Sequence, residues 1–208
     1  YVNDAFGTAH RAHASNVGMT NYFEEKAAGF LLMKEIDFLV KAIEAPARPF
    51  TVVMGGSKIS GKIDLLKRLA DVADNILIGG GMAYTFLKVQ GMTIGNSLVE
   101  EDYLKTAESL LAESKKTGTE IILPLDHVVA SEFAENAAAE MVDDVNVPDG
   151  KVALDIGPKT LEVLRARIAG AKSLVWNGPM GVFEFDAFAK GTLEVAEMVA
   201  ECNGTTVV

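Results

Sequence analysis

Residues 50–89 read FTVVMGGSKISGKIDLLKRLADVADNILIGGGMAYTFLKV and repeat one arrangement twice. A short β-rich apolar run (Phe50–Met54, then Asn75–Ile78) is followed by glycines, and the glycines are followed by a run with helical spacing (Lys62–Val72, then Ala83–Val89). Strands that alternate with helices of about ten residues predict βαβ units, in which consecutive strands lie parallel. This stretch therefore predicts the core of an α/β domain.

The same alternation continues to the end of the chain. Further strands are predicted over residues 120–123, 172–176 and 205–208, and further helices over residues 101–116, 159–169 and 187–201. The acidic, turn-rich segment Val142–Lys151 (VDDVNVPDGK) predicts a surface loop. We expect a Rossmann-like, three-layer αβα fold with a parallel sheet. Such sheets bind ligands at the carboxyl ends of their strands.

The first part of the chain has a different pattern. Apolar residues recur at helical spacing between Ala27 and Glu44, and Pro46 and Pro49 then stop the helix. A long helix followed by Ala-Pro-Ala-Arg-Pro is typical of a connector between domains. The chain opens inside a motif-like run at Tyr1 and ends at Val208 in a predicted strand, so we expect a fragment of a longer protein.

Composition excludes several classes of protein. The 208 residues carry a net charge of −10, which argues against general binding to nucleic acid or to an anionic membrane. The longest stretch without a charged residue, Asn75–Leu87, is too short to span a bilayer and contains three glycines. A single cysteine, Cys202, and no apolar leader sequence predict a reducing, cytoplasmic location.

Three glycine-bearing segments stand where a strand should pass into a helix: Gly55–Lys62, Gly79–Met82 and Asn177–Glu184. Glycine lets the backbone approach a ligand closely, and a helix N-terminus offers unpaired N–H groups to an anion. Lys58 and Lys62 add two ammonium groups at a predicted helix start. Any one of these loops could be an ordinary tight turn, but three at successive strand ends favour a mononucleotide crevice.

Two other interpretations of the glycines fit less well. Gly56–Lys62 satisfies the first part of a P-loop motif, but Ile63 stands where that motif needs a hydroxyl for Mg²⁺. Gly79, Gly80 and Gly81 are contiguous, which does not match a dinucleotide-binding fingerprint. A P-loop NTPase and a non-catalytic nucleotide-binding module remain as rival hypotheses.

Five motifs together resemble the phosphoglycerate kinase family, in order and spacing along essentially the whole chain. They are YVNDAFGTAHRAHAS (1–15), GGSKISGK (55–62), GGGMAYTFLK (79–88), DIGPKT (155–160) and WNGPMGVFE (176–184). The resemblance implies two Rossmann-like lobes joined by a long helix. It also implies reversible phosphoryl transfer between 1,3-bisphosphoglycerate and ADP, giving 3-phosphoglycerate and ATP, with Mg²⁺ accompanying the nucleotide.

The resemblance also implies a domain division. Residues 1–29 would be the end of the phosphoglycerate-binding lobe, residues 30–47 the interdomain helix and connector, and residues 48–208 most of the nucleotide-binding lobe. The family's aspartate motif for the Mg-nucleotide would follow Val208, so we expect the 208 residues alone to be inactive. Members of the family are usually monomeric, and we expect no nucleic-acid or membrane partner.

Site residues follow from the resemblance position by position. Lys58 and Lys62 match lysines that act on the transferred phosphoryl group and the nucleotide phosphates, where catalysis needs positioning and positive charge rather than a general base. Arg11 matches an arginine that grips the phosphoglycerate phosphate, and no residue matches a metal ligand. The expected nucleotide-binding set is Gly55, Gly56, Lys58, Lys62, Gly79, Gly80, Ala153, Leu154, Asn177, Pro179, Gly181, Val182 and Glu184.

Within that set, Gly79, Gly80, Leu154 and Val182 match the adenine slot, and Glu184 matches the acceptor of the ribose hydroxyls. Other residues that often carry chemistry are expected to be structural. His10 and His13 lack the further ligands of a metal site, His127 is predicted to lie in a loop, and Trp176 and Cys202 are predicted to be packed or buried.

Overall fold

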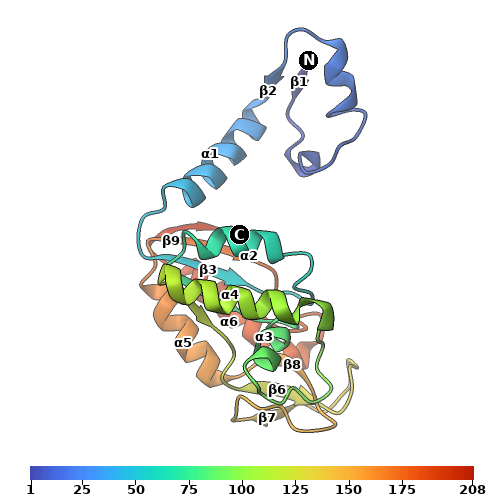
Figure 1. The fold of residues 1–208 in the computed structure, drawn as a ribbon, viewed down its shortest axis with the longest axis vertical. Helices are drawn as coiled ribbons and strands as arrows, with labels where there is room; N and C mark the ends of the chain where they lie inside the picture. Colours follow the sequence, from blue (N-terminus) through green and yellow to red (C-terminus); the bar gives the residue numbers. More distant parts are fainter. The chain divides into compact units, whose positions relative to one another are not determined.

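The computed structural model describes residues 1–208, except for the side chains of residues 40–42. The chain divides into two compact units, Tyr1–Ala45 and Pro46–Val208, which are described separately below. Figure 1 shows the order of the elements along the chain.

The first unit pairs two very short parallel strands, β1 (Val2–Asn3) and β2 (Ala27–Ala28), and continues into helix α1 (Phe30–Glu44). Two 3-10 turns, Phe6–Thr8 and Gly18–Tyr22, lie between the strands. The helix predicted from Ala27 therefore begins three residues later, because Ala27 and Ala28 pair with β1. Asp4 marks the new start: its Oδ1 accepts a hydrogen bond from the backbone N–H of Leu32 at 2.9 Å.

The second unit is built on a five-stranded sheet in the order β10-β9-β3-β4-β5, with every pair parallel. The strands are β3 (Phe50–Met54), β4 (Asn75–Ile78), β5 (Glu120–Ile122), β9 (Ser173–Asn177) and β10 (Thr205–Val207). Val52, at the centre, pairs with Ile76 on one side and Val175 on the other. All five predicted strands are present, within one residue of their predicted ends.

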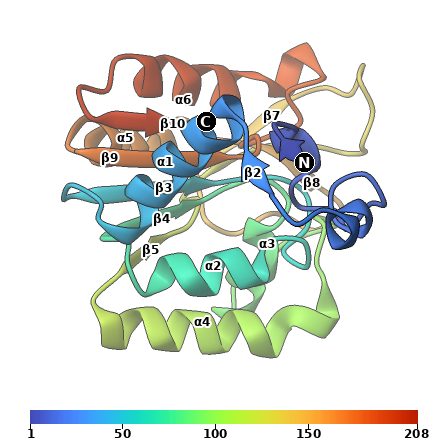
Figure 2. The ribbon, with the colours of Figure 1, turned by 90° about the horizontal axis from the view of Figure 1, so that it is seen from above.

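Helices cover both faces of this sheet (Figure 2). On one face lie α2 (Ile63–Ala70), α3 (Ala83–Val89) and α4 (Leu104–Thr117), and on the other lie α5 (Pro158–Ala169) and α6 (Lys190–Ala200). Alternate residues of β3 point to opposite faces: Val52 packs with the first group of helices and Val53 with the second. The predicted three-layer αβα architecture is confirmed.

The connections that follow the neighbouring strands β3 and β9 lie on opposite faces of the sheet. From β3 the chain crosses to β4 through α2 on one face, whereas from β9 it crosses to β10 through α6 on the other. Neighbouring parallel strands whose connections leave on opposite sides create a crevice between them, and ligands of open α/β sheets bind there. The topology thus places the expected ligand-binding edge of the sheet at the carboxyl ends of β3 and β9.

A second, antiparallel sheet was not expected from the sequence. It has the order β7-β6-β8 and is formed by β6 (His127–Ala130), β7 (Glu140–Val142) and β8 (Val152–Ile156). The prediction that His127 lies in a loop was wrong, because His127 begins β6 and its side chain is fully buried. Between Val142, which ends β7, and β8 the chain forms the loop predicted there.

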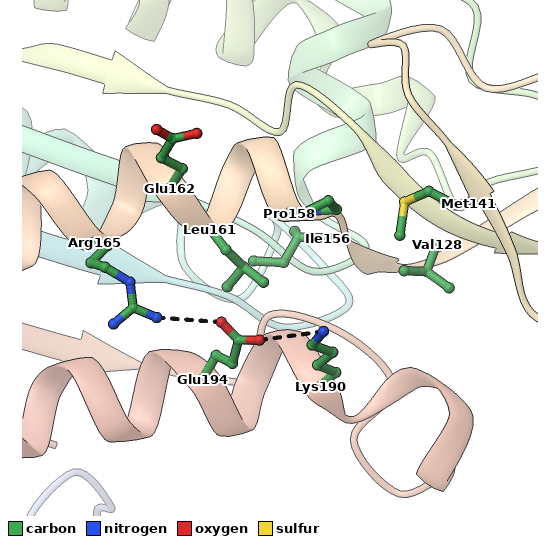
Figure 3. A pocket seen from close by; sticks show the side chains of 9 residues that line it. All are labelled: Val128, Met141, Ile156, Pro158, Leu161, Glu162, Arg165, Lys190 and Glu194. Atoms are coloured by element: carbon green, nitrogen blue, oxygen red, sulfur yellow. Dashed lines mark hydrogen bonds and ion pairs between the residues drawn. The ribbon is translucent and has the colours of Figure 1, made fainter.

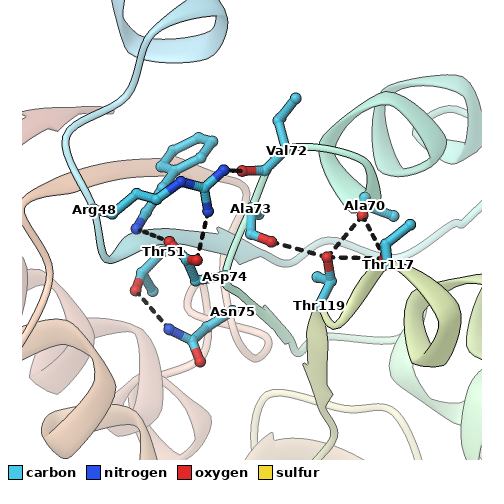
Figure 4. A network of polar contacts seen from close by, with 10 residues as sticks. Arg48, Thr51, Ala70, Val72, Ala73, Asp74, Asn75, Thr117 and Thr119 are labelled. Carbon is cyan, nitrogen blue, oxygen red and sulfur yellow. Dashed lines mark hydrogen bonds and ion pairs between the residues drawn. The ribbon is translucent and has the colours of Figure 1, made fainter.

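The amino ends of the central strands are held by side chains rather than by glycine loops (Figure 4). The Asp74 carboxylate accepts hydrogen bonds from the Arg48 guanidinium and from the backbone N–H of Phe50. The Thr119 hydroxyl lies 2.7 and 2.8 Å from the carbonyl oxygens of Ala70 and Ala73. These contacts fix the start of β3, β4 and β5, whereas the glycine loops follow the opposite ends of β3 and β4.

No helix in the described part of the chain has the length and apolar character needed to cross a membrane.

Candidate functional site

The three glycine loops predicted from the sequence meet at one edge of the central sheet and are hydrogen-bonded to one another. The backbone N–H of Gly55 donates to the carbonyl of Asn177 at 2.9 Å, and that of Gly56 donates to Pro179 at 2.8 Å. The loop after β4 joins them, because Gly80 N–H donates to the Met180 carbonyl at 2.9 Å. The ends of β3, β4 and β9 therefore form a single backbone surface.

This close contact requires glycine. Gly80 has a φ of +64°, and a Cβ there would lie 2.6 Å from both the backbone N and O of Gly56. A Cβ on Gly55 would lie 2.0 Å from the Pro179 carbonyl oxygen. Any side chain at either position would push the loops apart.

A pocket of about 450 Å³ opens above the joined loops. Its volume is in the range of small-molecule sites, and its walls are mostly apolar. Eight of the predicted nucleotide-binding residues line it: Gly56, Gly80, Ala153, Leu154, Pro179, Gly181, Val182 and Glu184. The other five predicted residues belong to the same loops but are not among the described residues that line this pocket: Gly55, Lys58, Lys62, Gly79 and Asn177.

The antiparallel sheet, which the sequence did not predict, supplies one wall of the pocket. Leu154 lies in β8, and Phe133 lies in the segment between β6 and β7. Phe133 is 65% exposed and its ring centroid lies 5.3 Å from that of Phe185. Lining residues absent from the prediction are Ser57, Gly81, Tyr84, Leu98, Phe133, Val152, Asp155, Met180 and Phe183. Six of these nine stand within the motifs quoted from the sequence. Leu98, Phe133 and Val152 lie outside those motifs, so only the folded chain could have identified these three.

Lys62 connects the loop after β3 to the end of β9. Its Nζ donates hydrogen bonds to the carbonyl oxygens of Gly55, at 2.6 Å, and Asn177, at 3.1 Å. Burial lowers the pKa of this ammonium from its usual value. Lys62 immediately precedes α2, whereas Lys58 is exposed in the loop, five residues before the helix. The two lysines are thus not both at the helix start, as the sequence had suggested.

Ile63 decides between two interpretations of the same loop. In a P-loop the residue after the lysine presents a hydroxyl to Mg²⁺. Here the Ile63 side chain is buried in the core between the sheet and α2. This placement argues against the P-loop interpretation of Gly56–Lys62.

Tyr84 and His127 form a buried polar contact behind the pocket. The Tyr84 hydroxyl lies 3.2 Å from His127 Nδ1, and His127 Nε2 lies 2.9 Å from the Val145 carbonyl oxygen. Because a carbonyl can only accept, Nε2 carries the proton and Nδ1 accepts from the tyrosine. Burial lowers the pKa of His127, which favours the neutral imidazole that this hydrogen-bond pattern requires.

Comparison with known proteins is consistent with this geometry. The sequence model of the family described as phosphoglycerate kinase matches residues 1–208 of the chain. The chain belongs to the phosphoglycerate kinase family.

Relatives and solved structures show how much of such a protein the chain represents. It is 51% identical to phosphoglycerate kinase from Clostridium botulinum and 54% identical to that from Borrelia duttonii, in each case over the whole chain. These matches cover 52% and 53% of the two relatives, so the chain spans about half the length of the curated relatives it matches.

Two solved phosphoglycerate kinases have the same fold. The structure from Coxiella burnetii matches with a TM-score of 0.92 and 41% identity, over 99% of this chain and 53% of that one. The structure from Pyrococcus horikoshii matches with a TM-score of 0.83 and 33% identity, over 98% of this chain and 51% of that one.

The first unit carries the residue that the resemblance to phosphoglycerate kinases assigns to phosphoglycerate. Arg11 is exposed, and its Nε donates to His10 Nε2 at 3.0 Å. Asn16 shapes this loop, because its Nδ2 donates to the carbonyl oxygens of Thr8 and Arg11. Arg11 is therefore presented on a loop with a defined conformation.

The described side chains include no cluster that is typical of a metal site. They contain no group of three or more His, Cys, Asp or Glu residues close enough to hold a metal ion.

A second cavity, of about 250 Å³, lies between α5, α6 and the antiparallel sheet (Figure 3). None of the predicted site residues lines it. Three of its four charged side chains pair with each other, since Glu194 lies 3.4 Å from Arg165 and 3.6 Å from Lys190. Because its two acidic and two basic side chains balance in charge, this cavity is a less favourable site for a phosphate than the joined glycine loops are.

Proposed function

We propose that the chain binds an adenine nucleotide in the pocket above the joined glycine loops. Within a protein of the family's length, we propose that it provides the nucleotide side of phosphoryl transfer between 1,3-bisphosphoglycerate and ADP, giving 3-phosphoglycerate and ATP. The observation that carries this proposal is the hydrogen-bonded junction of three glycine loops at the switch point of the sheet.

The pocket suits the parts of a nucleotide in turn. Leu154 and Val182 offer apolar side chains to the flat faces of a base, and the Phe133 ring stands at its rim. Glu184 is exposed at the same pocket and offers a carboxylate to ribose hydroxyls. Gly56 and Gly80 allow the phosphates to approach the backbone.

Lysine chemistry completes the proposal. Phosphoryl transfer spreads negative charge over three oxygens, so catalysis depends on positioned positive charge. Lys58 is exposed beside the loops and would follow the transferred group. Lys62 would exchange a carbonyl partner for a phosphate oxygen, and the added negative charge would favour its protonated form. Gly55, Gly79, Asn177 and Pro179 would shape this phosphate end.

The remaining assignments complete the same enzyme. Arg11 would bind the phosphate of the phosphoglycerate, through the planar fork of donors that suits arginine to that task. Residues 1–29 would belong to the phosphoglycerate lobe, residues 30–47 to the interdomain helix and connector, and residues 48–208 to the nucleotide lobe. Mg²⁺ would accompany ADP or ATP.

Calorimetric titration of the 208-residue chain with ADP tests the proposed binding. We expect Glu184→Gln to weaken ADP binding by about tenfold, since a charge-assisted hydrogen bond is worth about 1.5–3 kcal/mol. The same variant should bind 2′,3′-dideoxy-ADP as the unaltered chain does. Glu162→Gln, at the second cavity, is the matched control and should leave ADP affinity unchanged. The absence of ADP binding to the unaltered chain would refute the proposal.

Turnover is a separate question, tested by a coupled assay. We expect the 208-residue chain to form no ATP from 1,3-bisphosphoglycerate and ADP, because it spans about half of its relatives and Arg11 alone cannot enclose the acyl phosphate. Substantial ATP formation by this chain would contradict the division of labour between the two lobes.

A further inference from the structure

Asp155 is a buried carboxylate at the pocket that the proposed mechanism does not use. It lies in β8, lines the pocket and is only 2% exposed. Its Oδ1 accepts a hydrogen bond from the backbone N–H of Ile156 at 2.9 Å, and its Oδ2 accepts one from Gly191 at 2.7 Å. Both oxygens are therefore occupied by the protein's own backbone.

The Gly191 contact caps helix α6. Gly191 is the second residue of that helix, so its N–H has no partner within the helix. Ala189, which precedes the helix, has no polar side chain to supply one. Asp155 thus ties the N-terminus of α6 to the end of β8.

Two glycines allow the backbone to close around this carboxylate. A Cβ on Gly181 would lie 2.2 Å from Asp155 Oδ1, and a Cβ on Gly191 would lie 2.2 Å from the same atom. The Gly181 chain also runs along β8, because the next N–H, that of Val182, donates to the Leu154 carbonyl at 2.8 Å. The segment that carries Val182 and Glu184 is therefore packed directly against Asp155.

Helix α6 holds the same segment from its other side. Thr192, which follows Gly191, accepts hydrogen bonds at its Oγ1 from the backbone N–H groups of Met180, at 3.0 Å, and Gly181, at 3.4 Å. A continuous path thus leads from Asp155 through Gly191 and Thr192 to the pocket wall.

We propose that Asp155 is a positioning residue for the nucleotide pocket: it fixes the segment 179–184 against β8, and so sets nucleotide affinity without forming a hydrogen bond to the nucleotide. This inference rests on the proposed function. The two backbone N–H groups that face its carboxylate explain why an aspartate stands there. An asparagine has one acceptor oxygen and would turn its NH₂ group toward one of these donors.

Asp126 provides a matched control for the capping role. It is also fully buried, and it caps α5 by accepting from the backbone N–H groups of Lys159, at 2.8 Å, and Thr160, at 2.9 Å. Asp126 is not among the described residues that line the nucleotide pocket. A residue that only caps a helix should behave like Asp126 when it is replaced.

The experiment compares ADP affinities by calorimetry, well below the melting temperatures of all variants. Asp155→Asn and Asp126→Asn should both lower the melting temperature, but only Asp155→Asn should weaken ADP binding, by about tenfold. Thr192→Val should weaken ADP binding as well. The double variant Asp155→Asn/Thr192→Val should lose less affinity than the product of the two single losses, because both residues act through the same segment.

The outcomes separate this inference from the proposed function. If the unaltered chain binds no ADP, the proposed function fails and the inference with it. If the unaltered chain binds ADP and Asp155→Asn binds it equally well, the inference alone fails. If Asp155→Asn does not fold, Thr192→Val decides instead. Unchanged ADP affinity in the Thr192→Val variant would refute the positioning path.

Discussion

Replacing Asp155 with asparagine should change how the stability of the second unit depends on pH. Burial raises the pKa of this carboxyl from its usual 3.8 to about 6, and the nearby Glu194 charge adds to the effect. The folded state therefore holds the proton more tightly than the unfolded state does. Ionising this carboxyl therefore costs more free energy in the folded state than in the unfolded state. Its contribution to stability is full at low pH and is lost as the pH rises through about 6.

The size of the effect follows from the two pKa values. A difference of about 2 pH units corresponds to about 3 kcal/mol between fully protonated and fully ionised conditions. Between pH 5.0 and 7.5, about 1–2 kcal/mol of this contribution should disappear. In Asp155→Asn it is missing, so the stability of the unaltered chain relative to the variant should fall by that amount across this range.

Urea unfolding without nucleotide measures this difference. Trp176, the single tryptophan, lies in β9 and reports on the second unit by its fluorescence. Glu162→Gln, which removes a carboxylate from α5, is the control and should give a pH profile parallel to that of the unaltered chain. A difference between the unaltered chain and Asp155→Asn that stays constant from pH 5.0 to 7.5 would refute the reasoning.

Two other predictions concern the loops. Gly80→Ala and Gly118→Ala both place a side chain at positive φ, which should cost about 1–2 kcal/mol of stability at Gly118 and more at Gly80, where the Cβ also clashes with backbone atoms. Only Gly80→Ala should abolish ADP binding in calorimetry, because a Cβ at Gly118 meets no atom within 4 Å, whereas one at Gly80 strikes Gly56. In an enzyme of the family's full length, Lys58→Ala should lower kcat by about 10²–10³ while changing the Kd for ADP far less. A raised Kd with kcat intact would assign Lys58 to ground-state binding instead.

Much of the central sheet could be predicted because its signals are local. Phe50–Met54 and Asn75–Ile78 are apolar runs that are each followed by glycines, and both form strands with the predicted ends. Strand pairing then follows from the alternation with helices, which leaves little choice but a parallel sheet. The glycine loops could be identified for the same reason, since glycine is needed wherever the backbone is crowded.

The antiparallel sheet could not be predicted in this way. Its strands are as short as those of the central sheet, but no helix stands between β6, β7 and β8, so the strand–helix alternation that identified the other strands is missing here. His127 shows the consequence: next to Asp126 it resembles a polar loop residue, yet its partners Tyr84 and Val145 are 43 and 18 residues away.

The sequence by itself determined the fold class, the family and the loops at which a nucleotide would bind, because strand, helix and glycine signals act over a few neighbouring residues. Only the tertiary structure decided how the pocket is walled and braced. Lys62 bonds to Asn177 across 115 positions, and Asp155 reaches Gly191 across 36. Such contacts depend on which distant segments the packed layers bring together, and no local sequence pattern indicates that.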